Sequence, residues 1–264
     1  MSRKCFKLML LVVVFSLGVA VADEPVGDAA PWFSNAADDG GLWTTNENWW
    51  RGTAPTATDD VGQDNASALV VNSSMGNVFA NSLWVGDYGA GDETSYFEMQ
   101  SGVLVLADEL MIGYRDYEDW GNPEWANWGN GSVTILDGKI SVGTVLGVGS
   151  TDFEAGVGGV GQLHVDGGAI RATTLAIGVV DPDVLSIMGD VDNSVDITNG
   201  KLMLAGDISS LDPRVTAFGG AGYLVFEYEA DLAGYTTITA VPEPATVLLL
   251  GLGGLASLRR RKRA

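Results

Sequence analysis

Apolar and polar residues alternate with a period of two along the middle of the chain, in two recurring units. The first unit reads apolar-x-apolar-Gly and occurs as LWVG (83–86), LMIG (110–113), LGVG (146–149) and LAIG (175–178). The second unit reads apolar-x-apolar-x-x-Gly-x-apolar-x-apolar, and it occurs at 97–106, 133–142, 163–172 and 195–204. The glycines of the second unit, Gly102, Gly138, Gly168 and Gly200, are 36, 30 and 32 residues apart. Repeats of this length are typical of solenoids, propellers or arrays.

The alternation predicts β-strands with one buried face. Three short strands in each repeat, joined by glycine-containing corners, predict a parallel β-helix of about four coils stacked about 4.8 Å apart. The side chains that point inward would then form ladders from coil to coil: Phe97, Val133, Leu163 and Val195 in one, and Leu104, Ile140, Ile170 and Leu202 in another. Gly147, His164 and Arg171 are expected to point outward. A β-propeller, which needs about four strands in a repeat nearer forty residues, is the alternative fold.

The segments that flank the repeats differ from them, as the ends of a solenoid must. Residues 42–61 are rich in tryptophan and turn residues, and residues 223–241 are aromatic and acidic, so both are interpreted as caps. The predicted organisation is a signal peptide (1–22), an N-terminal cap region (23–82), β-helix repeats (83–207), a C-terminal cap (208–240) and a sorting signal (241–264). The first cap resembles the opening found before the autotransporter-like β-helical bodies of exported bacterial proteins. The residues that carry this likeness are Trp43, Asn48, Trp49, Gly52, Pro55 and Asp60.

The N-terminus has the features of a cleavable secretory signal. Basic residues precede an apolar run from Leu8 to Ala22 that ends in Ala20-Val21-Ala22, which predicts a signal helix and cleavage after Ala22. An uncleaved anchor helix is the alternative, although the run is short for a membrane span. The single cysteine, Cys5, lies before the cleavage site, so the mature chain would have no disulfide, thiol catalyst or cysteine-bound metal.

The C-terminus combines three parts in a fixed order. Val241, Pro242, Glu243 and Pro244 precede an apolar stretch from Ala245 to Leu258, and the basic residues Arg259, Arg260, Arg261, Lys262 and Arg263 follow. This stretch would be about 21 Å long as a helix, against a hydrocarbon core of about 30 Å, so it predicts only a short transmembrane helix. Its basic end favours the cytoplasmic side.

These three parts resemble the PEP-CTERM sorting signal of bacterial envelope proteins. The resemblance implies export, transient anchoring in the inner membrane and processing by an exosortase, a transpeptidase-like membrane enzyme. Signal peptidase would remove the N-terminal signal segment, residues 1–22. Proteins with such tails often accompany exopolysaccharide production, so exopolysaccharide is a candidate partner.

Net charge restricts the partners of the body. The whole chain carries −20, and residues 23–240 contain 33 acidic and 6 basic residues, a net charge of −27. Such a surface repels nucleic acid and anionic lipid headgroups, which bind through Lys and Arg. The six basic residues are scattered along the sequence rather than clustered.

Candidate catalytic residues are few. The sole histidine, His164, falls on an expected outward row with Glu98, Thr134 and Asp196, where a solvent-facing position explains it without catalysis. Zinc sites built on histidine or cysteine clusters are excluded. Asp190, Asp192 and Asp196 faintly resemble a dockerin-type calcium loop, but Val195 stands at the sixth position, where that loop has glycine. The sequence therefore predicts no cofactor, with calcium as the alternative.

An insertion, YRDYEDWGNPEWANWGN (114–130), lengthens one coil and carries Trp120, Trp125 and Trp128 among acidic residues. Aromatic rings beside carboxylates can stack on sugars, or they can fold back over the solenoid wall. The preferred hypothesis is therefore a non-enzymatic exported protein of the cell surface or extracellular matrix, structural or adhesive. The alternative is a carbohydrate-binding or polysaccharide-degrading β-helix enzyme, with Asp166 and Arg171 as candidates near His164.

Overall fold

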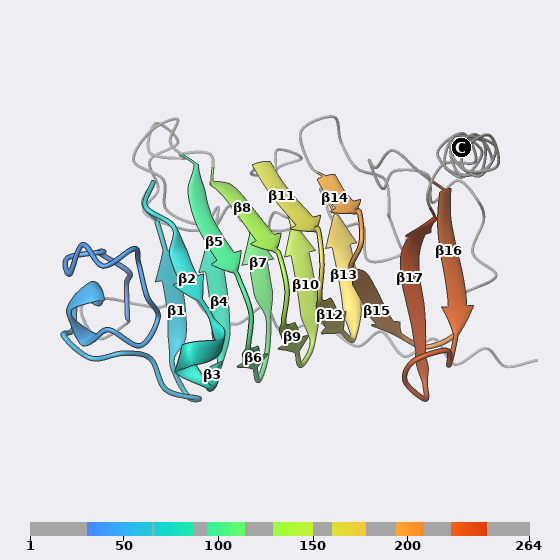
Figure 1. Ribbon diagram of the computed structural model, residues 1–264, viewed down its shortest axis with the longest axis horizontal. Coiled ribbons are helices and arrows are strands. Elements are labelled where there is room, and N and C mark those ends of the chain that lie inside the picture. Colours follow the sequence, from blue (N-terminus) through green and yellow to red (C-terminus); the bar gives the residue numbers. More distant parts are fainter. Residues whose placement is uncertain are drawn as a thin grey trace, which may run out of the picture.

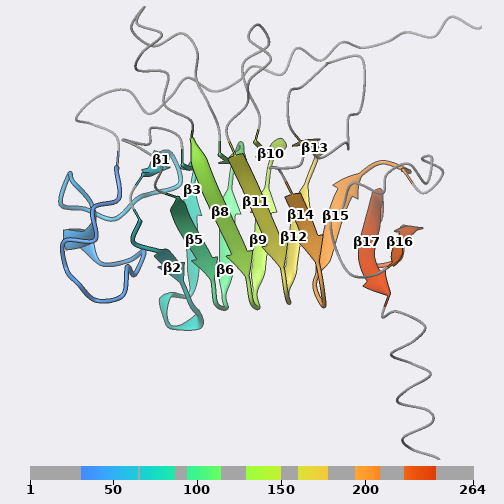
Figure 2. The same cartoon turned by 90° about the horizontal axis from the view of Figure 1, so that it is seen from above.

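The computed structural model describes residues 31–64, 66–86, 94–113, 129–149, 160–177, 194–208 and 223–241. These residues form an all-β body of three stacked parallel sheets, consistent with a β-helix, and the chain visits the three sheets in turn. Figure 1 shows the strands following one another along the long axis, from β1 near one end to the β16–β17 hairpin at the other. The view at right angles shows the same succession (Figure 2). The three sheets together are called the solenoid below.

Each sheet collects one strand from every coil. The first sheet contains β1 (Asp60–Gln63), β4 (Ser82–Val85), β7 (Leu110–Ile112), β10 (Val145–Val148) and β13 (Thr174–Ile177). The second sheet contains β2 (Leu69–Val71), β5 (Ser95–Met99), β8 (Asn130–Ile135), β11 (Val160–Val165) and β14 (Ser194–Ile197). The third sheet contains β3 (Asn77–Ala80), β6 (Val103–Leu106), β9 (Lys139–Val142), β12 (Ala169–Ala172), β15 (Lys201–Ala205), β17 (Tyr235–Val241) and β16 (Tyr223–Tyr228).

The registers confirm the ladders expected from the repeat. Phe97 pairs with Val133, Val133 with Leu163, and Leu163 with Val195 through the second sheet. The third sheet aligns Leu104, Ile140, Ile170 and Leu202. The first sheet aligns the leucines of the four apolar-x-apolar-Gly units, Leu83, Leu110, Leu146 and Leu175. The apolar residues that alternate along each strand are therefore stacked on the equivalent residues of the neighbouring coils.

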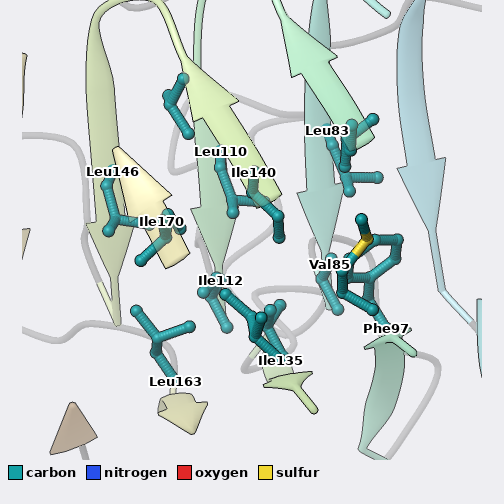
Figure 3. Close-up of a cluster of buried hydrophobic side chains, with 14 of the residues drawn as sticks. Leu83, Val85, Phe97, Leu110, Ile112, Ile135, Ile140, Leu146, Leu163 and Ile170 are labelled. Atoms are coloured by element: carbon teal, nitrogen blue, oxygen red, sulfur yellow. The ribbon is translucent and has the colours of Figure 1, made fainter. Parts of the chain in front are cut away.

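The hydrophobic core lies inside the three sheets. In Figure 3, Leu110 from β7, Ile135 from β8 and Ile140 from β9 point into one interior, and each is at most 1% exposed. Aliphatic and β-branched side chains dominate these inward positions, where they pack well on a pleated surface. Because each coil contacts mainly the coils beside it, the core is a continuous column rather than a central cluster.

Glycines make the corner between the second and third sheets. Gly102, Gly138 and Gly168 have φ of 91°, 89° and 63°, which is left-handed backbone that favours glycine. Gly200 lacks a positive φ, but a Cβ on it would lie 2.7 Å from the carbonyl oxygen of Gly167. Three of these glycines thus adopt the left-handed backbone conformation that the corner requires. The fourth is needed because a side chain there would clash with the preceding coil.

The parallel ladders extend one coil further toward the N-terminus than the four repeats. Strands β1, β2 and β3 pair with β4, β5 and β6, although β1, β2 and β3 lie inside the range 23–82, for which the sequence predicts an N-terminal cap region. In this coil the corner between the second and third sheets runs from Asn72 to Gly76 and contains a short 3-10 helix, η2 (Ser73–Met75). The corners of the other coils hold three residues and this one is longer, but Gly76 still directly precedes β3 as Gly102 precedes β6, and its φ is 69°.

Residues before β1 cover the outer edges of the first coil. Trp32 forms a parallel bridge with Gly62 on β1, and Leu42 forms one with Val70 on β2. Trp43 and Trp49, which flank the 3-10 helix η1 (Asn46–Asn48), are 1% and 2% exposed, and the Trp49 indole N–H donates to the Trp43 carbonyl at 2.9 Å. The Trp43 ring also lies edge-on to Phe97 of the second coil, with ring centroids 6.5 Å apart.

Polar groups also tie this segment together. The buried Asn48 side chain donates to Asp39 at 2.8 Å and to the Leu42 carbonyl at 3.1 Å. The guanidinium of Arg51 donates to both carboxylate oxygens of Asp59, at 2.7 and 2.6 Å. These hydrogen bonds hold the pKa of Asp59 well below its usual range.

A hairpin covers the last strand of the third sheet. Strand β17 pairs antiparallel with β15, and β16 pairs antiparallel with β17. Ile238 of β17 is fully buried and continues the ladder that ends in Leu202. The sheet therefore changes from parallel to antiparallel pairing where the repeats stop.

Candidate functional site

Four long connections of the solenoid belong to one corner. They join the first sheet to the second and comprise residues 86–94, 113–129, 149–159 and 178–193. The corners between the second and third sheets hold three residues in these coils, and those between the third and first sheets hold one to three. Because the strands stack in register, the four long connections leave and rejoin the solenoid in a row parallel to its axis. We call this row the loop corner.

Glycines allow the backbones of the first and second sheets to approach closely at the base of the loop corner. A Cβ on Gly86 would collide with the backbone of Asn130 in the next coil, and a Cβ on Gly113 would collide with Val160. Gly131 and Gly161 are equally tight against the backbone of Val85 and of Gly149. At each of these close approaches, the two backbone segments contain a glycine at the point of contact or next to it. The backbones of the first and second sheets therefore approach each other there without side chains between them. The connections can therefore differ in length while the core below stays unchanged.

A polar row runs along the outer face of the second sheet. Glu98, Thr134, His164 and Asp196 occupy equivalent positions on β5, β8, β11 and β14. The His164 Nδ1 lies 3.3 Å from the Asp196 Oδ2, and both side chains are about one-third exposed, at 32% and 31%. The expected outward position of His164 is confirmed. The pair bridges two neighbouring coils on an open sheet face.

The structure separates the other candidates of the enzyme hypothesis. His164 and Arg171 lie on the outer faces of different sheets, and Asp166 lies in the corner between them. Arg171 donates to Ser141 Oγ through Nη2 at 2.5 Å and through Nε at 3.2 Å. The three residues do not converge on one point.

The calcium candidates are only partly described. Asp196 belongs to β14, whereas Asp190 and Asp192 lie outside the residues that the structure describes. Within the described ranges, no group of three or more His, Cys, Asp or Glu side chains is placed to hold a metal ion. Trp120, Trp125 and Trp128 also lie outside them, within the connection between β7 and β8. The same holds for the signal segment 1–22 and the tail from Pro242 onward.

Basic side chains gather on the outer face of the third sheet. Lys139 on β9 and Lys201 on β15 both align with Ala169 on β12, and Arg171 lies two residues further along β12. The description of the basic residues as scattered is therefore wrong for half of them, because residues about thirty positions apart become neighbours when coils stack. Their sequence signal was the position after the corner glycine, Gly138-Lys139 and Gly200-Lys201.

These cations differ in their partners. The Lys201 ammonium donates to Asp231 at 2.9 Å, which lowers the pKa of that carboxyl. Arg171 bonds to a hydroxyl, and the Lys139 ammonium has no hydrogen-bond or ion-pair partner among the described residues. Lys139 is exposed, and Arg171 and Lys201 are half-buried. We call these three residues the basic cluster.

Comparison with known protein families identifies the PEP-CTERM protein-sorting motif at residues 240–263. The expected motif at the C-terminus is thus confirmed, and it implies an exported protein that an exosortase sorts and that its C-terminal tail anchors. Comparisons with curated proteins and with solved structures give no match. Among the described residues, no helix has the length and apolar character needed to cross a membrane.

Proposed function

We propose that this protein is a non-enzymatic structural or adhesive component of the bacterial cell surface or extracellular matrix. The observation that carries the proposal is the loop corner, a row of four long connections on one side of a regular body whose chain ends in a sorting motif. A solenoid holds successive loops at fixed intervals, which suits repeated contacts with a surface or polymer. Loops on a rigid scaffold are also where binding residues concentrate.

The arrangement of titratable groups supports a role without catalysis. A general base needs a partner that orients it and a substrate held within hydrogen-bond reach. His164 has Asp196 as a partner, but the pair lies on an outer sheet face, and Arg171 faces outward from another sheet. This separation favours the structural role over the polysaccharide-degrading alternative.

The proposed route has two processing steps. Signal peptidase acts after Ala22, and an exosortase-type enzyme acts near Val241–Pro244 while the apolar tail holds the chain in the inner membrane. The body then reaches the cell surface or the matrix. The signal segment, the single cysteine within it and the basic C-terminal block are absent from the mature product.

Localisation tests the route. An epitope inserted after Glu154, in the connection 149–159, marks the full chain in the bacterium that carries it. The wild-type tag should be cleaved by protease added to intact cells or should be found in the matrix. The variant Pro242→Ala/Glu243→Ala/Pro244→Ala should stay in the inner-membrane fraction, whereas the control Thr246→Ala should behave as wild type. A tag that remains in the cytoplasm would refute the proposed export.

Loss of the gene tests the role. Cells without it should attach to surfaces less, or retain less matrix, and the full chain should restore both properties. Unchanged attachment and matrix would contradict a structural or adhesive role. Release of reducing sugar ends by the purified full chain would favour the enzyme alternative instead.

A further inference from the structure

We propose that the outer face of the third sheet binds a linear acidic polysaccharide, and that the basic cluster contacts its carboxylates. This proposal rests on the export proposed above, and it names a class of partner that the loop corner alone does not define. It depends on three properties of the face, namely its charge, the spacing of its cations and its apolar surface.

The face differs in charge from the outer face of the second sheet and from the chain as a whole. Strands β3, β6, β9, β12 and β15 read NVFA, VLVL, KISV, AIRA and KLMLA, without one Asp or Glu, although residues 23–240 contain 33 acidic and 6 basic residues. The outer face of the second sheet carries Glu98 and Asp196 instead. Every outward residue of these five third-sheet strands is exposed or half-buried, so the face is open to solvent. A positive strip on an acidic body indicates an anionic partner.

The spacing of the cations fits an extended polymer. Lys139, Arg171 and Lys201 belong to three successive strands, which lie about 4.8 Å apart, so the basic cluster covers about 10 Å along the solenoid axis. A small anion would meet only one or two of the three charges. A chain with carboxylates at regular intervals can meet all of them, and Arg171 can bind a carboxylate through two parallel hydrogen bonds.

Apolar groups on the same face favour a sugar polymer over other polyanions. Phe79 is 42% exposed and lies in the same outward row as Val105, Ser141 and Arg171. The apolar face of a sugar ring can pack on such a side chain, whereas phosphate groups or peptide carboxylates cannot. The surrounding negative charge also repels densely charged polymers such as nucleic acid, and it tolerates a polymer with about one charge per sugar at physiological ionic strength.

The ion pair between Lys201 and Asp231 does not prevent binding. Both side chains are partly exposed, at 44% and 38%, and pairs of this kind contribute little to stability. A carboxylate of the ligand can therefore replace Asp231 beside the ammonium. The exposed Lys139 ammonium is open to a ligand without any rearrangement.

The test measures binding of alginate, a linear uronic-acid polymer, to the full chain purified in mild detergent. Wild-type protein should bind alginate, and neutral dextran should not bind. Lys139→Gln should weaken binding about two- to fivefold, the value expected for one partly exposed charge contact. Lys139→Gln/Arg171→Gln/Lys201→Gln should weaken it more than about tenfold. Salt should weaken wild-type binding more than binding by the triple variant.

Gln162→Glu on the outer face of the second sheet is the matched control, because it changes net charge by the same amount as Lys139→Gln at an exposed position. It should leave alginate binding within about twofold of wild type, since it lies outside the proposed contact. An equal effect of both variants, no binding of alginate, or equal binding of dextran or poly-L-glutamate would each overturn the proposal. Because this measurement uses purified protein, it can fail while export succeeds, and the reverse also holds.

Discussion

Leu163 offers a direct test of the ladder that holds the coils together. It is fully buried on β11, between Val133 of the preceding coil and Val195 of the next. Replacing a buried leucine with alanine removes its transfer free energy and leaves a cavity, at a typical cost of 2–5 kcal/mol. Hydrogen-bonded strands on both sides hold Val133 and Val195 in place, so we expect the cavity to remain largely open. The loss in free energy of unfolding should then lie near the middle of the range, at about 3 kcal/mol.

For a chain of this length, 1 kcal/mol corresponds to a change of about 2–4 °C in Tm, so Leu163→Ala should lower Tm by about 6–12 °C. The assay is thermal unfolding of the full chain followed by far-UV circular dichroism. Gln162→Ala on the same strand is the control, because Gln162 is exposed and its removal leaves no cavity. We expect that control to change the free energy of unfolding by less than about 0.5 kcal/mol. If Gln162→Ala destabilises the protein as much as Leu163→Ala does, the assignment of inner and outer faces is refuted.

Two further predictions concern the cap and the corners. Because Arg51 holds the pKa of Asp59 below its usual value, the stability from this pair is present above about pH 4, the ordinary aspartate range, and is lost as the pH falls further. Between pH 5 and pH 2 the wild type should therefore lose more stability than Asp59→Asn in urea unfolding, and equal losses would contradict this assignment. Six Gly and Ser residues inserted after Glu154 should lower stability by less than about 1 kcal/mol, since lengthening a surface loop costs little. The same insertion after Gly167 should cost more stability, because this corner packs against the preceding one, where a Cβ on Gly167 would collide with the Leu136 carbonyl oxygen, and equal tolerance at both sites would argue against the assigned corners.

The four repeats were predictable because their inward positions are apolar and because the corner glycine keeps the same position between the apolar residues of each second unit. A parallel strand must place equivalent residues at the same height in every coil, so one regular corner is enough to set the ladders. The outward rows of the second and third sheets followed from the same alternation, including the half-buried His164 and Arg171, whereas Gly147, which the sequence also places outward, is buried.

The first coil was not recognisable for a physical reason. Its corner is lengthened by the η2 turn, and the inward position that is Val85 in the next coil is occupied by Gln63, whose buried side chain donates to the carbonyls of Ser67 and Tyr96. A polar residue at an inward position and a longer corner remove both features that define the repeat. Pattern matching cannot recover a coil of this kind, because the side-chain amide N–H groups of its glutamine find their carbonyl acceptors only after folding.

The basic cluster was missed for a different reason. Lys139, Arg171 and Lys201 are each separated by about one repeat, and only the coil-to-coil register places them on successive strands of one face. Charge clusters on a solenoid must therefore be sought at the repeat period rather than along the chain. Recognising the loop corner also required the order of strands in the sheets. The sequence alone shows where the insertions occur but not that they belong to the same corner.

The alignment of Gly138 with Gly168 in consecutive coils has a consequence for how such a chain can change in length. Removing 139–168 would join Gly138 directly to Ala169, delete one complete turn of the column and leave every remaining strand facing an equivalent neighbour. Gene duplication or loss in steps of one turn would therefore lengthen or shorten the protein without a new core. Insertion or deletion of part of a turn would misalign the strands. Relatives whose solenoids differ in length should therefore differ by whole turns.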